Sequence, residues 1–430
     1  MELIANKYST WLGDFPNHWE VLRIKNLFQE MDSRSETGKE ELLSVSHYTG
    51  VTLKRESLEN EDDHLTNAES LVGYKLVHQG DLVVNIMLAW NGSLGISPFN
   101  GITSPAYCVY RVKGGNNPEY FGYLFSTNLF KEEFRRHSTG IIDSRLRLYS
   151  DKFFSIFTVM PPKDEQDEIV QYIKAQQEKI NLFIQKKKRF IVFLKEQRQS
   201  NIDEAVIKGI NPNVKFKNTK YDWLGVIPEH WQIRRLGTIG SFSKGGNISR
   251  AELVENGIPA ILYGDIYTKY DIEANSIFNR IEEETAANSI KIEKGDLLFT
   301  GSGETKEDIG KCIVFNGDDD VYVGGDVIIF KQNEFDSHFI SYSQNSSLAK
   351  YQKAVSSKGD IIVHTYGSKL RNVVMPYPTT IEEQKQIVSN IKTETATIDT
   401  AIAKAEREIE LIREYKEAMI AEAVMGKRKM

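Results

Sequence analysis

Residues able to carry catalysis are scattered through this sequence of 430 residues. Its eight histidines do not cluster, and its two cysteines, Cys108 and Cys312, lie far apart without ligand-like neighbours. This spacing argues against a zinc site or a disulfide framework. The phosphate-binding pattern Gly-x4-Gly-Lys-[Ser/Thr] is absent, and no Gly-x-Gly-x-x-Gly follows a strand. His18 and His230 each precede a tryptophan and are expected to be packing or turn residues. We therefore expect no catalytic residue, no metal and no cofactor.

Loops rich in hydrogen-bond donors offer a different chemistry. Residues 243–250 combine the backbone freedom of two glycines with Lys, Asn and Arg, which hydrogen-bond the base edges of nucleic acids. Residues 301–306 form a similar loop, and residues 86–91 align with them. In a third loop, alternating arginines are expected to face one side of a strand. The candidate DNA-binding residues are Lys244, Asn247, Arg250, Ser302, Thr305, Lys306, Trp90, Asn91, Ser138, Thr139, Arg145 and Arg147.

Each of these loops also has a plain structural interpretation. The loop at 243–250 could be an ordinary surface turn, and Trp90 could equally belong to the core. The two arginines could lie on a solvated edge. Both interpretations remain open at this stage.

Two long helices must position these loops, because isoleucine recurs every 11 residues in two separate segments. A step of 11 residues is close to three turns of an α-helix, so each row stays on one face. Neither segment contains proline, and each helix is expected to be roughly 65 Å long. So narrow an apolar stripe needs a partner helix, and each segment is the natural partner of the other. The predicted core of this pair is Ile169, Ile173, Ile180, Ile184, Ile191 and Ile202 with Ile387, Ile391, Ile398, Ile402, Ile409 and Ile420.

The repetition extends beyond the helices to the whole chain. Trp11–Trp19 matches Trp223–Trp231 at an offset of 212, and Gly80-Asp81-Leu82 matches Gly295-Asp296-Leu297 at 215. The helices match at an offset of 218. An offset that grows in small steps is what loop insertions produce in two copies of one fold. The sequence therefore predicts a tandem duplication of roughly 210 residues.

Each copy is expected to begin with a strand-rich domain. Leu82–Val84, Leu297–Phe299, Tyr107–Val112 and Val321–Phe330 have the composition of strands. Asn117 precedes a proline and is expected to cap a helix running to about Arg136, with a counterpart from Asp336 to about Val355. Prolines at 161–162 and at 376 and 378 must separate each domain from its long helix.

Composition sets the class of protein. A hydrophobic content of 40% and a charged content of 27% are typical of a soluble globular protein, and no run of 18 apolar residues exists. The first residues lack the features of a signal peptide, so we expect a cytoplasmic protein without membrane contact. Residues 1–208 carry 26 basic and 28 acidic side chains, and the rest of the chain carries 28 and 32. Neither half is therefore basic enough to suggest tight, unaided nucleic-acid binding.

Taken together, the repeated segments resemble the specificity (S) subunits of type I restriction–modification systems. The resemblance rests on Met160-Pro161-Pro162 with Glu165-Gln166 and on its repeat at Met375-Pro376 with Glu383-Gln384. The Gly-Asp-Leu segments, Ser104–Tyr107 and the loop from Lys244 to Pro259 also carry it. It covers nearly the whole chain in both halves, and it strengthens the assignment of Lys244 and Asn247 to DNA.

The resemblance implies an α+β architecture in which two tandem α/β target-recognition domains are separated by two long antiparallel helices, a coiled-coil-like pair, with a pseudo-twofold internal duplication. The expected bounds are 1–162 and 223–378 for the domains, 163–209 and 379–430 for the helices, and 210–222 for the linker. Each domain would read half of a split site in double-stranded DNA. The helices would dock two adenine-N6 methyltransferase subunits, to which nuclease/translocase subunits can bind.

Two other classes of function stay open on the sequence alone. A tandem adaptor could clamp two proteins without DNA, but it would not need amide-rich and basic loops at matching positions. An enzyme would need acid, base or metal-binding groups in register in both halves, and none is found. We expect a non-catalytic specificity subunit whose partners hold the methylation and endonuclease activities.

Overall fold

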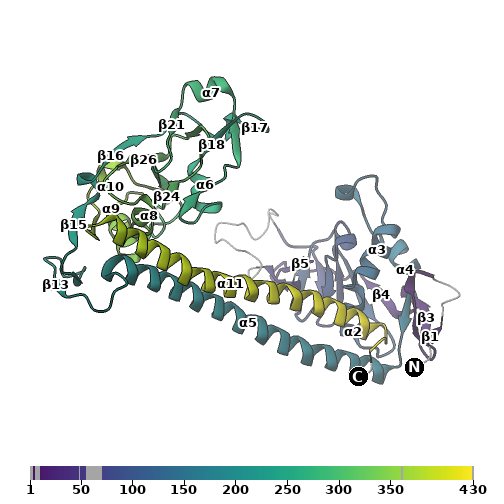
Figure 1. The fold of residues 1–430 in the computed structure, drawn as a ribbon. Coiled ribbons are helices and arrows are strands. Elements are labelled where there is room, and N and C mark those ends of the chain that lie inside the picture. The colour runs from purple at the N-terminus through teal and green to yellow at the C-terminus, as the bar shows by residue number, and fades with distance from the viewer. Residues whose placement is uncertain (1–2, 5–9, 48, 55–69, 360–361, 429–430) are drawn as a thin grey trace. The chain divides into compact units, whose positions relative to one another are not determined.

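The computed structural model describes residues 3–4, 10–47, 49–54, 70–359 and 362–428 (Figure 1). The chain divides into two compact units, one of residues 1–187 with 407–430 and the other of residues 188–406. Each unit contains one β-rich domain and parts of both long helices, so this division crosses the helices. The five bounded segments expected from the sequence remain a prediction.

The first β-rich domain is built on a four-stranded antiparallel sheet in the order β4-β11-β8-β9. These strands cover Phe28–Met31, Cys108–Val112, Leu82–Val84 and Leu94–Ile96. The strand pairs around it are β1 (Leu3–Ile4) with β2 (Phe15–Pro16), β3 (Glu20–Arg23) with β12 (Phe157–Met160), β5 (Leu43–Ser46) with β6 (Gly50–Leu53), and β7 (Lys75–Val77) with β10 (Gly101–Thr103). Its short helices are α1 (Ile24–Leu27), α2 (Pro118–Phe125), α3 (Asn128–His137) and α4 (Ser150–Ser155).

The second β-rich domain repeats this plan with additional strands. Its main sheet has the order β16-β26-β22-β24-β19, over Ser241–Lys244, Val327–Lys331, Leu297–Thr300, Cys312–Phe315 and Glu273–Ala274. A second sheet has the order β17-β20-β18-β25-β21, over Leu253–Val254, Asn279–Ile281, Ile258–Ile261, Val321–Val323 and Ile290–Ile292. The strand pairs are β13 (Phe216–Asn218) with β14 (Val226–Pro228), β15 (Gln232–Arg235) with β28 (Val374–Tyr377), and β23 (Ser302–Gly303) with β27 (Val363–His364). The short helices are α6 (Tyr263–Thr268), α7 (Glu283–Ala287), α8 (Ser337–Gln344), α9 (Ser347–Ser356) and α10 (Gly367–Leu370).

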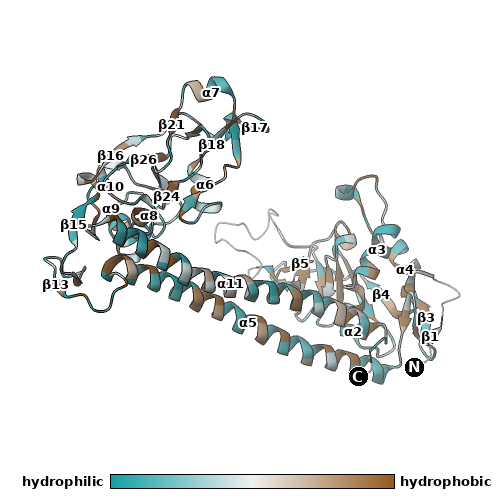
Figure 2. Ribbon diagram, in the orientation of Figure 1, coloured by the Kyte–Doolittle hydropathy of each residue, from teal (hydrophilic) through white to brown (hydrophobic). Residues whose placement is uncertain are grey.

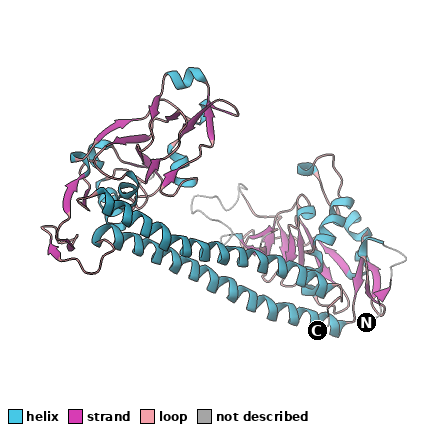
Figure 3. Ribbon diagram, viewed as in Figure 1, coloured by secondary structure: helices cyan, strands magenta, loops and turns pink. Residues whose placement is uncertain are grey.

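The two long helices, α5 (Lys163–Lys208) and α11 (Ile381–Val424), begin 218 residues apart. Figure 3 shows that they dominate the helical content, while the strands gather in the two β-rich domains. Glycines with positive φ end both helices: the N–H of Gly209 (φ +76°) donates to Ala205, and that of Gly426 (φ +65°) donates to Ala423. The predicted α+β fold with two long helices packed together is confirmed.

Contacts within each unit show that α5 and α11 run antiparallel. In one unit Lys187 forms an ion pair with Glu408. In the other, Arg198 pairs with Asp399 at 2.8 Å, and Asn201 contacts Glu394 at 3.4 Å. Along these pairs the residue number rises on one helix as it falls on the other. The structure buries Ile180 and Ile398 (5% and 8% exposed) together with Ile169, Ile173, Ile191, Ile202, Ile387, Ile391 and Ile409, and half-buries Ile184, Ile402 and Ile420. Figure 2 shows the hydrophobic residues recurring along both helices.

Tryptophan side chains anchor the beginnings of both long helices. The indole N–H of Trp19 donates to Glu165 at 2.9 Å, and His18 Nε2 lies 2.5 Å from the same carboxylate. In the second copy, Trp231 and His230 contact Glu383 at 2.9 and 3.0 Å. The expectation that the two histidines serve packing or turns therefore needs one addition, because each also binds the first turn of a helix.

The glutamine after each of these glutamates is buried, and it hydrogen-bonds the residue that caps a short helix, α2 in the first domain and α8 in the second. Gln166 Oε1 accepts the N–H of Asn117 at 2.8 Å, and Gln384 Oε1 accepts that of Asp336 at 2.7 Å. Their amide groups donate to the carbonyls of Pro161 and Pro378 at 2.9 and 3.1 Å. The repeated Glu-Gln pair thus joins each long helix to its own domain.

Two of the predicted elements are divided in the structure. The helix expected from Asn117 to Arg136 forms α2 and α3, and its counterpart forms α8 and α9; Asn117 and Asp336 do cap the first member of each pair. The break between α8 and α9 follows from Asn345, whose side chain binds the backbone N–H and carbonyl of Cys312 at 3.1 and 2.6 Å. The strand expected over 321–330 forms β25 and β26, because Gly324 turns to donate its N–H to Ile261 at 3.0 Å.

Candidate nucleic-acid interface

In the first domain a backbone hydrogen bond joins two of the predicted loops. The N–H of Leu148 donates to the carbonyl of Ile86 at 2.9 Å, although 62 residues separate them in the chain. Thr139 and Arg147 exchange backbone hydrogen bonds, each of 2.9 Å, so the loop between them is closed at its base. The structure thereby brings the segment containing Trp90 and Asn91 next to the loop of residues 138–147.

Trp90 lies in a 3-10 turn (Ala89–Asn91) and is half-buried, as is Asn91. Its indole N–H donates to the carbonyl of Met87 at 3.2 Å. The guanidinium of Arg135 lies over its ring at 5.2 Å, and Arg135 also pairs with Asp143 at 2.7 Å. Trp90 therefore supports the exposed Arg135, a role that neither of the two sequence interpretations included.

The expected strand with alternating arginines is wrong. Arg145 ends a 3-10 turn (Asp143–Arg145) and is exposed. Arg147 is half-buried, and its Nη1 donates to the carbonyls of Ser144 and Leu146 at 3.2 and 2.8 Å. The chain turns back on itself here to pair Arg147 with Thr139, so no extended strand carries the two arginines. The Ser138 hydroxyl donates to Phe134 at 2.8 Å and so extends the end of α3, while Thr139 is exposed.

The second domain brings its equivalent loops together in the same way. The N–H of Thr365 donates to the carbonyl of Gly301 at 2.9 Å, and strands β23 and β27 pair beside this bond. Ser302 is buried, and its hydroxyl lies 3.0 Å from Nδ1 of His364. Thr305 and Lys306 are exposed beyond β23. Burial raises the pKa of Tyr267 to about 12, so its hydroxyl stays neutral and donates to the Ser302 carbonyl at 3.2 Å.

A cavity of about 610 Å³ lies next to these loops in the second domain. Lys244, at the end of β16, and Ser302 both line it. Asn247, Arg250, Thr305 and Lys306 do not. Asn247 is exposed, and Arg250 begins a 3-10 turn (Arg250–Glu252) capped by Ser249. The structure thus joins two of the predicted contacts in one cavity and leaves the other four on nearby loops.

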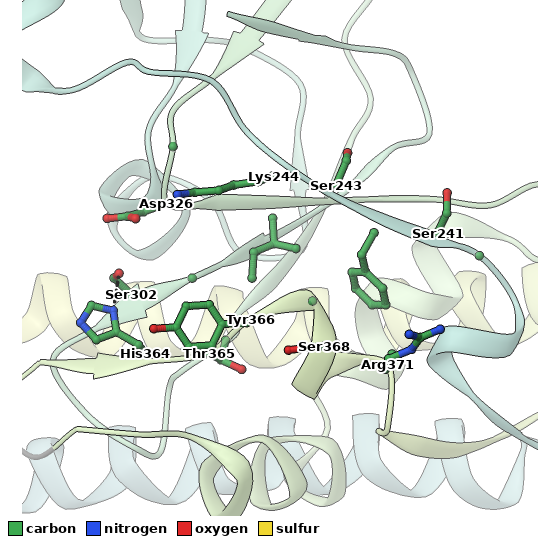
Figure 4. Close-up of a pocket in the computed structure, with 16 residues that line it drawn as sticks. Ser241, Ser243, Lys244, Ser302, Asp326, His364, Thr365, Tyr366, Ser368 and Arg371 are labelled. Carbon is green, nitrogen blue, oxygen red and sulfur yellow. Dashed lines mark hydrogen bonds between the residues drawn. The ribbon is translucent and has the colours of Figure 1, made fainter.

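Figure 4 shows residues of this cavity that the sequence analysis missed. Three of them lie close together in the chain: His364 ends β27, Tyr366 precedes α10, and Ser368 lies in α10. Arg371 directly follows α10, and Asp326 directly precedes β26. The hydroxyl of Thr365 is buried there without a hydrogen-bond partner among the described atoms. A signal was present in the sequence, because Ser357-Lys358-Gly359 matches Ser138-Thr139-Gly140 at an offset of 219.

The described residues contain no group of three or more His, Cys, Asp or Glu side chains placed to hold a metal ion. No helix in the described part of the chain is both long and apolar enough to cross a membrane.

Comparisons with known proteins agree on one family. Residues 228–411 match the family Methylase_S, the type I restriction modification DNA specificity domain. The Type I restriction enzyme MjaVIII specificity subunit of Methanocaldococcus jannaschii is 24% identical over 437 residues, covering 96% of this chain and 93% of that protein.

Two solved structures share the fold. A chain from a structure on complex assembly and conformational transition of the type I R-M system superposes with a TM-score of 0.69 at 14% identity, covering 96% of this chain and 99% of that one. The HsdS subunit from Thermoanaerobacter tengcongensis superposes with a TM-score of 0.50 at 15% identity, covering 96% and 98%. With its duplicated domains and packed long helices, the chain is similar in sequence and in fold to the specificity subunits of type I restriction–modification systems.

Proposed function

We propose that this chain is a type I specificity subunit that reads a two-part target in double-stranded DNA, with one half-site for each β-rich domain. We further propose that α5 and α11 dock two adenine-N6 methyltransferase subunits, through which nuclease/translocase subunits can join. The subunit itself would supply recognition and geometry, while methylation and DNA cleavage would belong to its partners.

The observation that carries the proposal is the duplicated junction of two loops. In the first domain the N–H of Leu148 donates to Ile86, and in the second the N–H of Thr365 donates to Gly301, at 2.9 Å in both cases. Each acceptor lies in the loop that follows a Gly-Asp-Leu strand. Donor side chains collect at each junction, with Arg135 and Arg145 in the first domain and Lys244 and His364 in the second. Two matching surfaces of this kind suit a target with two separate halves.

The chemistry of these side chains suits base recognition. Lys and Arg donate to guanine O6 and N7, Asn pairs with adenine, and Ser or Thr hydroxyls bind either partner. The second-domain cavity adds an acceptor, Asp326, whose carboxylate can accept a hydrogen bond from the amino group of cytosine. The whole chain has a net charge of −6, so most neutralisation of DNA phosphates would fall to the partner subunits.

Support for docking on the helices comes from a second apolar stripe on α5. Leu182, Phe183, Phe190 and Phe193 fall within about 100° around the helix axis, on a different face from the isoleucines. All four are exposed, as is Tyr415 on α11. A large apolar surface left in water on an ordered helix is typical of a protein contact.

The test is an exchange of one domain. Residues 223–378 are replaced by the equivalent domain of a relative that methylates a different site, while Glu383 and Gln384 stay in place to bind the graft. We expect one half of the methylated motif to change and the other half to persist, as read by long-read mapping of methyladenine in cells. The matched exchange of residues 1–162 should change the opposite half. A simultaneous change of both halves after either exchange would refute the proposal.

A further inference from the structure

The loop between α3 and α4 holds two isoleucines in water at its tip. Ile141 is 99% exposed and Ile142 is 54% exposed. A single exposed apolar residue is ordinary, but two adjacent ones on a loop of a DNA-recognition domain need an explanation. The second domain has a similar feature, because Ile362 is 57% exposed within the loop that the Lys358–His364 backbone pair closes.

The backbone of the first-domain loop keeps this tip from folding back. The two hydrogen bonds between Thr139 and Arg147 close its base, and the Arg145 N–H donates to Ile142 at 2.8 Å within the tip. Gly140 has a φ of +150°, and a side chain there would come within 2.6 Å of the Arg145 carbonyl oxygen. The tip is thus built compactly, and its apolar side chains point to a use outside the domain.

Several arginines and one aspartate, Asp143, lie in this loop or at the end of α3 beside it. Arg145 lies three residues beyond Ile142 and forms no ion pair within the described part of the chain. Arg135 is held beside Trp90 and pairs with Asp143 in the same loop, while Arg147 binds the loop's own carbonyls. An apolar tip with arginines near it is complementary to DNA. The stacked base pairs of DNA form an apolar interior, and its two phosphate chains carry negative charge.

We propose that Ile141 enters DNA as a wedge between two adjacent base pairs of the half-site that the first domain reads. The inference rests on the proposed function and deepens it. With such a wedge, recognition of the half-site would also depend on how easily that base-pair step unstacks. Isoleucine suits the task because its β-branched side chain has few rotamers and loses little freedom on insertion. Apolar wedges of this kind kink DNA in other binding proteins. The arginines would contact the phosphates on either side of the opened step.

The experiment uses the full chain in complex with its methyltransferase subunits. Duplexes carry 2-aminopurine at single positions of the first half-site, and fluorescence reports unstacking. The methylated adenine is left unlabelled, because methyltransferases extrude their target base themselves. We expect wild-type protein to raise the fluorescence at one step, and Ile141→Ala to abolish that rise and weaken binding of the duplex about tenfold. Ile141→Leu should retain most of both effects.

Ile210→Ala, which alters an exposed isoleucine of the linker, is the matched control and should behave as wild type. Fluorescence and affinity unchanged in Ile141→Ala would overturn the proposal. So would a variant that binds DNA normally but no longer copurifies with the methyltransferase, because the tip would then be a protein contact. The domain exchange separates the two levels of inference: if it succeeds while Ile141→Ala has no effect, only the wedge is wrong.

Discussion

Trp231 donates its indole N–H to the carboxylate of Glu383 at 2.9 Å, which joins the beginning of the second domain to the first turn of α11. The same tryptophan faces Gly209, the glycine that ends α5: a Cβ placed there would lie 3.1 Å from its ring. One side chain thus contacts the beginning of one long helix and the end of the other. In the first copy, Trp19 contacts Glu165 and Gly426 in the same way.

Replacing Trp231 by Phe should therefore lower the stability of the chain by about 1–3 kcal/mol, because the Glu383 carboxylate loses a donor in a half-buried place. Thermal unfolding of the purified chain measures the effect. Trp223→Phe is the matched control, since Trp223 is 46% exposed and belongs to the same repeated segment. Equal losses in the two variants would show that the contact with Glu383 is unimportant.

Buried carboxylates should disrupt the packing of the long helices. We expect Ile180→Asp combined with Ile398→Asp to unfold the helix pair, since each unpaired charge in an apolar contact costs several kcal/mol. Circular dichroism during heating gives the measurement. Leu182→Asp places the same charge two residues away on an exposed face and should change stability by less than about 0.5 kcal/mol. A stable double variant would mean that the isoleucine rows are not the core.

The exposed stripe on α5 should matter for assembly and not for folding. Phe193, which is 59% exposed, is changed to Asp. We expect copurification with the methyltransferase subunit to fall sharply while the melting temperature stays within error. Val355→Asp alters an apolar residue of α9 that is 70% exposed and should leave assembly intact. Normal assembly of the Phe193 variant would place the docking surface elsewhere.

The cavity residues of the second domain should control one half of the target. His364→Ala removes the ring that contacts Ser302, and Lys244→Ala removes a cation at the cavity wall. We expect either change to relax one position in the second half-site and to weaken binding about tenfold, the usual effect of a lost base contact. Mapping of methylated motifs provides the measurement. A uniform loss at all sites, without a change of motif, would instead indicate phosphate contacts.

Lys353 gives a prediction for pH. It is buried and donates to the carbonyls of Gly310 and Gln344 at 2.5 and 2.7 Å, and burial lowers its pKa from 10.5 to about 7. Between pH 7 and pH 10.5 the unfolded chain therefore binds more protons at this residue than the folded chain does. The contribution of Lys353 to stability accordingly rises with pH through this window and is smallest below pH 7.

Urea unfolding at pH 7 and pH 9 tests this sign. Relative to Lys353→Met, the wild-type chain should gain on the order of 1–2 kcal/mol between the two pH values. Lys350→Met, on the same helix, should show no such gain. A constant difference between wild type and Lys353→Met would mean that Lys353 does not lose its proton in the folded chain.

The sequence by itself determined the elements that depend on local periodicity and on the chain's own backbone. The 11-residue isoleucine rows indicated the length of α5 and α11 and their mutual packing. An apolar row that stays on one face of a helix must be buried, and a second helix with the same row can bury it. The caps at Asn117 and Asp336 were readable because an N-cap needs only a side chain and the backbone two or three residues later. The duplication located the loops that follow the Gly-Asp-Leu strands.

Only the tertiary structure decided which distant loops meet and where side chains point. Ser302 and His364 are 62 residues apart, and nothing local indicates that they touch. Asn345 interrupts a helix because Cys312, in another strand, offers it a donor and an acceptor. The periodicity of apolar residues indicates which face of a helix or strand a residue lies on. Which residue it contacts there depends on the packing of the whole domain.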